Sequence, residues 1–354
     1  MLYRLVWSAL ISIQCHAKER HYANIDEWIR MRCSLNPMED TIVEWSGPVY
    51  ALEPQQKQKY LFDVYGINLA RCWWNRTEEQ YYFSSRELQY YLDQDKKPLK
   101  TWKNPWTNET LNVVHTANDP VQFAVGTVGY MYWLNGNDQA TFPSNINLFY
   151  ENPLQCSEDP EYHNKHGDCQ ISESRRKKFL PYSHQEFYES TELFDFFVDE
   201  SVMKDATVDS APLHFSWSRF SQFMPWMKME MTKGSLLFTA HGGKVNFDTV
   251  PDWLKDEVSN RIPIYRHSPR CYENANSVTS WTYFDLYYDE YLAGDQFPIG
   301  VTEEPACLLD EITQYDRRPV DEITSTPIDE ITSTTSSAKS ILPLIGFYLI
   351  NKLF

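Results

Sequence analysis

The chain is poor in glycine, in basic residues and in the motifs that mark the common enzyme classes. It holds 12 Gly among 354 residues, and 32 Lys and Arg stand against 49 Asp and Glu, so its formal net charge is −17. This negative charge argues against generic binding to nucleic acid or to an anionic leaflet, and no basic cluster beyond residues 175–178 argues otherwise. The sequence has no Gly-rich phosphate loop, His-Glu-x-x-His site, Gly-x-Ser-x-Gly elbow or kinase signature, which disfavours standard hydrolases, kinases and dehydrogenases. We expect no cofactor.

Aromatic and other apolar residues are plentiful instead. The chain is 42% hydrophobic and 15% aromatic, which excludes global disorder, and it is neither collagen, coiled coil nor polytopic membrane protein. With so little glycine, one large aromatic-rich body is favoured over a string of small modules. We predict a single globular domain over residues 18–301.

The first 17 residues have the order of a cleaved signal peptide. Arg4 precedes the apolar residues 5–13, and small residues lie at the −3 and −1 positions of a cut after Ala17. A buried helix or short membrane anchor is the alternative, but this nine-residue stretch crosses roughly half of a ~30 Å hydrocarbon core. The sequence therefore predicts export to the cell exterior.

The other end of the chain changes composition. Residues 302–340 are rich in Pro, Thr, Ser and carboxylates and repeat Asp-Glu-Ile-Thr three times, which is typical of a solvated stalk. The apolar tail 341–354 follows a polar spacer, as in a glycosylphosphatidylinositol signal, although the spacer is short and Pro343 and Lys352 interrupt the tail. We predict membrane contact only through such a lipid anchor, with a freely secreted protein as the alternative.

An even number of cysteines remains once Cys15 leaves with the signal peptide. In an oxidising compartment six cysteines allow three disulfides, and Cys156 with Cys169 would close a polar loop. Two further pairs are predicted, Cys33 with Cys72 and Cys271 with Cys307. The sequons at Asn75 and Asn108 predict a glycoprotein if the chain is exported.

The body carries mainly strand patterns. A capped helix is predicted to start after Asn24, with Asp26 and Glu27 in its first turn. Strands are then predicted over residues 41–52, 59–69, 80–92 and 121–133, with a tight turn at residues 135–138. Short connections between successive strands indicate antiparallel pairing. The fold class is therefore mainly β (α+β), an antiparallel meander or barrel-like sheet with a few covering helices.

Two later segments complete this prediction. A helix is expected to be capped by Asp248 or Thr249, with Pro251 in its first turn, and to cover a face of the sheet or close a barrel end. Residues 280–292 fit neither period and are left as helix or edge strand.

Several short motifs occur in a familiar order. They include Glu44-Trp45-Ser46-Gly47-Pro48-Val49-Tyr50, Leu61-Phe62-Asp63-Val64-Tyr65-Gly66-Ile67-Asn68, Arg86-Glu87-Leu88-Gln89-Tyr90-Tyr91-Leu92-Asp93, Trp102-Lys103-Asn104-Pro105-Trp106-Thr107 and Asn118-Asp119-Pro120-Val121. The ensemble resembles the domain of unknown function family number 1838 over about residues 28–292. The resemblance implies one continuous domain and carries no activity with it.

Candidate site residues come from strand-like segments. If the sheet closes, His115, His241 and Arg71 could converge as proton donors or anion holders, although a hydrogen-bonded structural role is the commoner outcome for a histidine. His163 and His166 lie near carboxylates, but a solvated loop is favoured there over a metal site, so we expect no metal. The residues expected to line a ligand cavity are Trp45, Asn68, Trp102, Asn104, Trp106 and Trp281.

Three functions remain open at this point. The leading hypothesis is a secreted or cell-surface protein that binds a small apolar or aromatic molecule in an aromatic-lined β cavity. An extracellular enzyme of unassigned reaction and an adhesion or matrix protein are the alternatives. The sequence does not define the ligand or the oligomeric state.

Overall fold

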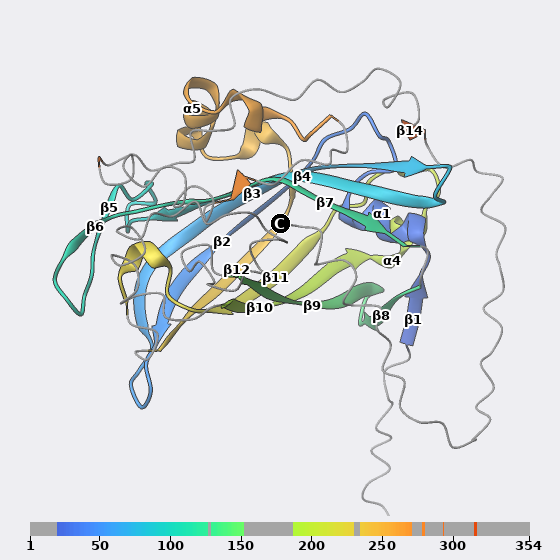
Figure 1. Ribbon diagram of the computed structural model, residues 1–354. Helices are drawn as coiled ribbons and strands as arrows, with labels where there is room; N and C mark the ends of the chain where they lie inside the picture. Colours follow the sequence, from blue (N-terminus) through green and yellow to red (C-terminus); the bar gives the residue numbers. More distant parts are fainter. Residues whose placement is uncertain are drawn as a thin grey trace, which may run out of the picture.

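The structure is a computed structural model that describes residues 20–126, 129–151, 187–229 and 234–270, with residues 278–279, 293 and 315–316 (Figure 1). Its strands are β1 (Arg20–Ala23), β2 (Thr41–Leu52), β3 (Lys59–Asn75), β4 (Gln80–Leu92), β5 (Thr101–Lys103), β6 (Thr110–Asn112), β7 (Thr116–Val125), β8 (Tyr130–Asn135), β9 (Gln139–Glu151), β10 (Phe187–Asp199), β11 (His214–Ser221), β12 (Ser235–Val245), β13 (Val278–Thr279) and β14 (Tyr315–Asp316). Its helices are α1 (Ile25–Arg32), α4 (Glu200–Lys204) and α5 (Asp252–Asn260), with 3-10 turns η1 (Pro225–Met227), η3 (Phe247–Thr249) and η4 (Pro263–Arg266).

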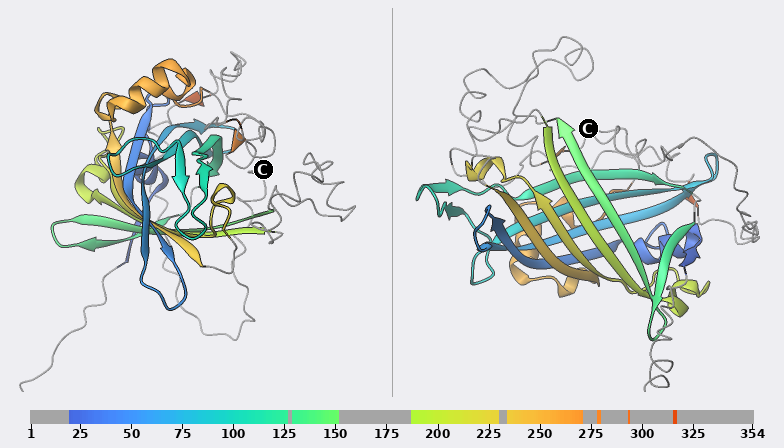
Figure 2. Two further views of the ribbon diagram at one scale, coloured as in Figure 1. Left: turned by 90° about the vertical axis from the view of Figure 1, so that its left-hand side faces the viewer. Right: turned by 90° about the horizontal axis from the view of Figure 1, so that it is seen from below.

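One large antiparallel sheet organises the described residues. Twelve of the strands described join it, in the order β1-β8-β9-β10-β11-β12-β2-β3-β4-β7-β13, with β14 beside β3. The sheet curls into a half-barrel, so that β4 and β7 lie in an upper layer and β9 and β10 in a lower one (Figure 1). Seen from below, β9 to β12 run side by side (Figure 2).

The two faces of this sheet have different coverings. On the convex face, Leu254 and Val258 of α5 share a buried cluster with Leu88 and Tyr90 of β4. Helices α1 and α4 lie at one end of the half-barrel, and the β5–β6 hairpin lies at the other (Figure 1). The concave face is therefore bounded by the curled sheet and by elements at its two ends.

Aromatic clusters fill both ends of the concave face. Near α1, the ring of Trp28 stacks on that of Tyr130 with centroids 4.3 Å apart. At the other end, the ring of Trp226 in η1 lies 5.8 Å from that of Trp102 in β5 and 6.1 Å from that of Phe62. Rings at these separations stabilise packing beyond simple burial of area.

The predicted fold class is confirmed, and so are most of the strands. Strands 41–52 and 80–92 have the predicted bounds, and strand 59–69 continues to Asn75. The turn at residues 135–138 joins β8 to β9, with Asn137 and Asp138 at positive φ, a conformation these residue types tolerate. The single strand expected over residues 121–133 is wrong. Gly126 and Gly129 separate β7 from β8, and the two strands lie on distant parts of the sheet.

The two predicted helices differ in outcome. Helix α1 has a complete capping box, in which the Asn24 side chain accepts from the Glu27 backbone N–H and the Glu27 carboxylate accepts from that of Asn24. The cap expected at Asp248 or Thr249 is wrong, because these residues form η3 and Pro251 holds the cap position of α5 without a side-chain hydrogen bond. Helix α5 covers a face of the sheet, as predicted.

Several predictions fall outside the described residues. These concern the signal peptide, the C-terminal tail, the segment 280–292, and the residues Trp281, His163, His166, Cys156, Cys169, Cys271 and Cys307. Among the residues that are described, no helix is long and apolar enough to cross a membrane.

Candidate functional site: a polar belt on the concave face

Two glycines of the sheet each lie directly beneath an aromatic ring. On β3, Gly66 lies under the indole of Trp45, and a Cβ added to this glycine would approach Trp45 Cε2 to 2.1 Å. On β12, a Cβ at Gly242 would come within 2.7 Å of the ring of Phe215. Side chains larger than hydrogen would push these rings away from the strands. Gly66 therefore allows Trp45 to lie flat against the concave face.

Beside Trp45, the inner face becomes polar. Asn68 of β3 pairs with Glu87 of β4, which pairs in turn with Asn118 of β7, so the three side chains share one row across the sheet. The Asn118 amide donates to Glu87 Oε1 at 3.2 Å, and the Asn68 amide donates to the Ser85 hydroxyl at 3.0 Å. These side chains make one polar wall within an otherwise apolar interior.

The opposite wall carries an ion pair. Glu192 of β10 and Arg219 of β11 are directly paired across the sheet, with 3.2 Å between Arg219 Nη1 and Glu192 Oε1. Each side chain is 13% exposed. Strands β12, β2 and β3 separate this pair from β4, yet the charges of Glu192 and Arg219 both act on Glu87. The curl of the sheet thus brings the two walls within electrostatic reach. We call the side chains of both walls the polar belt: Asn68, Ser85, Glu87, Gln89, Asn118, Glu192 and Arg219.

Aromatic side chains lie against the polar belt. Trp45 donates its indole N–H to Gln89 Oε1 at 2.9 Å, which joins this ring to β4. Its ring meets that of Trp217 edge-on, with centroids 6.4 Å apart. Phe194 of β10 lies 6.4 Å from Trp217 between ring centroids. Trp45 and Phe194 are only half-buried, so part of each ring remains available for contact.

The Glu87 carboxyl has a strongly raised pKa. Burial raises the pKa of its carboxyl to about 7, and the nearby charge of Glu192 adds to this shift. The Arg219 guanidinium and the amides of Asn118 and Asn68 act in the other direction. Burial also raises the pKa of Glu192, against the opposing effects of Arg219 and the Trp217 indole. Side chains whose pKa is strongly shifted by burial and by a nearby charge cluster at functional sites.

Comparison with known families places this sheet in one of them. Residues 38–174 and 166–288 match the family described as "Protein of unknown function (DUF1838)". The chain belongs to this family. All residues of the polar belt lie within the matched segments, whereas α1 precedes them. The DUF1838 assignment confirms the resemblance found in the sequence motifs. No curated protein matches the chain.

In this DUF1838 protein the three expected catalytic residues do not converge, which corrects the expectation. His115 is buried in the core, where its Nδ1 accepts from the Tyr91 backbone N–H at 3.1 Å and burial lowers its pKa to about 3. His241 is exposed on the convex side of β12. Arg71 donates to Asp40 at 2.9 Å, away from the polar belt.

The six expected ligand-contacting residues divide into two groups, with Trp281 outside the described part. Trp45 and Asn68 lie on the concave face at the polar belt. Trp102 is buried in the aromatic end cluster. Asn104 is fully buried and shapes the β5–β6 turn, because its Oδ1 accepts from the backbone N–H of Trp106 at 2.8 Å. Trp106, on the same hairpin, donates its indole N–H at 2.9 Å to Glu53, which follows β2. These three residues are structural.

Cysteine and sequon positions are partly described. Cys33 and Cys72, predicted as a disulfide pair, are instead free, buried thiols that share one hydrophobic cluster. Asn75 ends β3 at a turn, and Asn108 lies exposed in the β5–β6 turn at positive φ. Their glycosylation stays a prediction. Within the described ranges, no group of three or more His, Cys, Asp or Glu residues could hold a metal ion.

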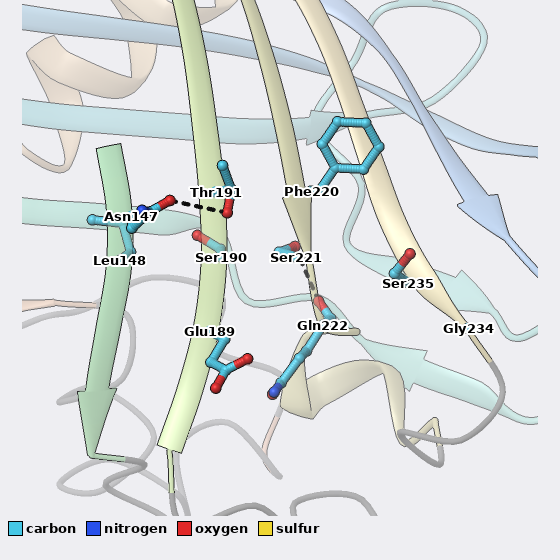
Figure 3. Close-up of a pocket in the computed structure, with 10 residues that line it drawn as sticks. All are labelled: Asn147, Leu148, Glu189, Ser190, Thr191, Phe220, Ser221, Gln222, Gly234 and Ser235. Atoms are coloured by element: carbon cyan, nitrogen blue, oxygen red, sulfur yellow. Dashed lines mark hydrogen bonds between the residues drawn. The ribbon is translucent and has the colours of Figure 1, made fainter. Parts of the chain in front are cut away.

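A second concavity lies at the ends of β9 to β12. It has a volume of about 580 Å³, and its lining includes Glu189, Thr191 and Gln222 (Figure 3). The Thr191 hydroxyl is already bonded to the Asn147 side chain, 3.2 Å away. Glu189 is exposed, and no ion pair or group with a shifted pKa lines this depression among the described residues. The polar belt therefore remains the stronger candidate site.

Proposed function

We propose that this protein binds a small organic molecule on the concave face of its half-barrel, against the polar belt and the rings of Trp45 and Phe194. The observation that carries this proposal is the combination of converging polar groups with half-buried aromatic rings between two apolar end clusters. Small-molecule sites are mostly apolar, with a few placed polar groups that fix the orientation of the ligand.

The predicted export signals suggest where this binding would occur. A secreted or surface-anchored body would meet its ligand outside the cell, at the distance from the membrane that residues 302–340 allow. This location is part of the proposal and rests on the sequence of the two chain ends.

A ligand screen tests the proposal directly. The purified full chain is screened against flat and apolar small molecules by thermal shift, and hits are confirmed by native mass spectrometry. We expect Trp45→Ala to weaken binding of the best hit roughly tenfold, since it removes a ring face from the site. His241→Ala is the matched control, because His241 is exposed on the convex face. Absence of any hit, or equal affinity in the Trp45→Ala variant, would contradict the proposal.

An enzymatic function is the second candidate, favoured by Glu87. A carboxyl with a pKa near 7 can both donate and accept a proton at neutral pH. Incubating the protein with each confirmed ligand and following it by mass spectrometry would detect conversion. Conversion that Glu87→Gln abolishes would favour catalysis, and unchanged ligand would favour binding alone.

A further inference from the structure

The charges of the polar belt do not balance. When all three groups are ionised, Glu87 and Glu192 carry two negative charges and Arg219 carries one positive charge. The guanidinium is already engaged by Glu192 at 3.2 Å. The contacts of Glu87 are different, because Asn118 and Asn68 supply only neutral amide donors. An ionised Glu87 thus lacks a cationic partner of its own among the described residues.

Two other cationic side chains, Lys244 and Arg32, interact with groups other than Glu87. Lys244 of β12 donates to the backbone carbonyls of Cys33 and Arg30 and to Ser210. The Arg32 guanidinium lies 4.3 Å from the centre of the Phe196 ring near α1. Glu192 and Arg219 are the charged groups of the described chain that act on Glu87 across the concave face.

An independent observation on the facing wall also indicates a ligand. Trp217 is only 6% exposed; its indole N–H acts on the nearby Glu192 carboxylate without reaching it in hydrogen-bond geometry, and it completes no hydrogen bond with any other described residue. A buried donor without an acceptor is costly and rare in folded proteins. A ligand atom with a lone pair, placed beside Glu192, would satisfy it.

The rings around the polar belt suit a positive charge as well as a flat group. Trp45 is held flat over Gly66 and is half-buried, so one face of its indole is supported by the sheet. Cations are attracted to the faces of tryptophan and phenylalanine rings, and this attraction grows when water is excluded.

We propose that the polar belt selects an organic cation, a protonated amine attached to a flat ring, with the ammonium group against Glu87 and the ring against Trp45 and Phe194. An acceptor atom on the same ligand would reach the Trp217 indole. This inference rests on the proposed function and specifies its ligand class. It requires Glu87 to be ionised when the ligand is bound.

Three probes that share one ring system test the inference with the full chain. They are 1-naphthylmethylamine, which is cationic, 1-naphthylmethanol, which is neutral, and 1-naphthoate, which is anionic. Their affinities are measured by isothermal titration calorimetry. Because a hydrogen bond between charged groups exceeds a neutral one, we expect the amine to bind at least about tenfold more tightly than the alcohol.

Two variants and a pH series then test whether the Glu87 carboxylate causes the preference for the amine. Glu87→Gln should remove the preference for the amine over the alcohol. Asp195→Asn is the matched control, since it removes the same charge from an exposed position on the convex side of β10. With a pKa of about 7 for Glu87, the wild-type affinity for the amine should fall about tenfold between about pH 8 and about pH 6.

The outcomes separate this inference from the proposed function. Equal affinity for the amine and the alcohol, or full affinity for the amine in Glu87→Gln, would overturn the cation class, while loss of binding in Trp45→Ala would still support the site. If neither these probes nor any molecule from the ligand screen binds, both proposals fail. Should Glu87→Gln not fold, the wild-type pH series decides, because a flat profile for the amine overturns the inference.

Discussion

Two carboxyl groups of this protein, Asp40 and Glu87, each lie near an arginine, yet their pKa values are shifted in opposite directions. Asp40, which precedes β2, accepts from Arg71 at 2.9 Å and from the Ser268 backbone N–H at 3.2 Å, and it also bonds the Ser268 hydroxyl. His267 Nδ1 lies 2.9 Å from its second oxygen. Burial alone would raise the pKa of Asp40, but the hydrogen bonds of Ser268 and His267, together with Arg71, lower it below its ordinary value.

Glu87 shows the contrary balance. Its arginine, Arg219, is shared with a second carboxylate, and burial raises the pKa of Glu87 to about 7. The difference between the two sites lies in the number and charge of their donors. Asp40 accepts hydrogen bonds from the Arg71 guanidinium and from Ser268. Glu87 has only amide donors, and Glu192 competes with it for Arg219. Strongly shifted pKa values cluster at functional sites, so the raised pKa marks Glu87, and not Asp40, as the functional candidate.

The Ser268, His267 and Asp40 side chains lie together, but their hydrogen bonds do not follow the order of a catalytic triad. In a triad, histidine bonds serine and aspartate orients the histidine. Here Asp40 bonds both partners itself, and Ser268 is fully buried. The cluster instead fastens the segment after η4 to β2 and β3, and Arg86 of β4 supports it by donating to the carbonyls of Ile264 and His267.

The largest expected effect comes from Asp40→Asn. This change leaves Arg71 without its carboxylate and replaces a charged acceptor by a neutral one, so we expect a loss of about 3 kcal/mol in unfolding free energy at neutral pH. Urea unfolding followed by tryptophan fluorescence measures it. The folded protein holds the pKa of Asp40 below its value in the unfolded chain, so the carboxylate stabilises the fold above the unfolded pKa. The wild type should therefore lose this stabilisation as the pH falls from the unfolded pKa of Asp40 through its folded pKa. A loss within about 0.5 kcal/mol would show that the Asp40 cluster is dispensable.

Glu87→Gln should act with the opposite sign. Because the pKa of Glu87 is raised from 4.5 to about 7 on folding, the wild type loses stability as the pH rises between these values and keeps that deficit above them. Glutamine carries no charge to bury, so the variant should be more stable by about 2 kcal/mol at about pH 8 and nearly equal at about pH 4. Unfolding curves at both pH values test the sign. A variant that is less stable than the wild type at about pH 8 would show that the carboxylate is satisfied in the fold.

This contrast also shows how far the sequence could lead. Strands 41–52 and 80–92 were predictable because β-branched and aromatic residues run between clear turn residues. The break between β7 and β8 was not, since Gly126 and Gly129 interrupt a run whose strand propensity continues on both sides. Pro251 similarly displaced the expected cap of α5.

The site was predictable only in part. Trp45 and Asn68 were found because they stand in aromatic-rich strand motifs, whereas Trp102, Asn104 and Trp106 stand in such motifs for local reasons of the β5–β6 hairpin. Ser85, Glu87 and Gln89 alternate along β4, and this period of two could have marked a polar inner face. The facing pair of Glu192 and Arg219 could not be found, because only the order and curl of the strands bring it opposite β4.

A smaller effect is expected for Ser268→Ala. Ser268 is fully buried and its hydroxyl bonds Asp40, so the change removes one hydrogen bond to a charged acceptor while its backbone N–H bond to Asp40 remains. We expect a loss of about 1.5 kcal/mol, roughly half that of Asp40→Asn. Chemical unfolding of the single and double variants tests it. If the cluster acts as one unit, the double variant should lose less than the sum of the two single variants.

The smallest expected effect is that of His267→Ala, which removes the exposed hydrogen-bond partner of Asp40. The His267 side chain is 56% exposed, so water can replace its bond to Asp40 with little change in free energy. We expect a loss of about 0.5 kcal/mol, and no change in ligand binding at the polar belt on the opposite face. Unfolding and calorimetric titration of the same variant check both statements. A loss as large as that of Ser268→Ala would mean that the histidine orders the segment after η4, and the saturation of Asp40 would then depend on its exposed partner as much as on its buried ones.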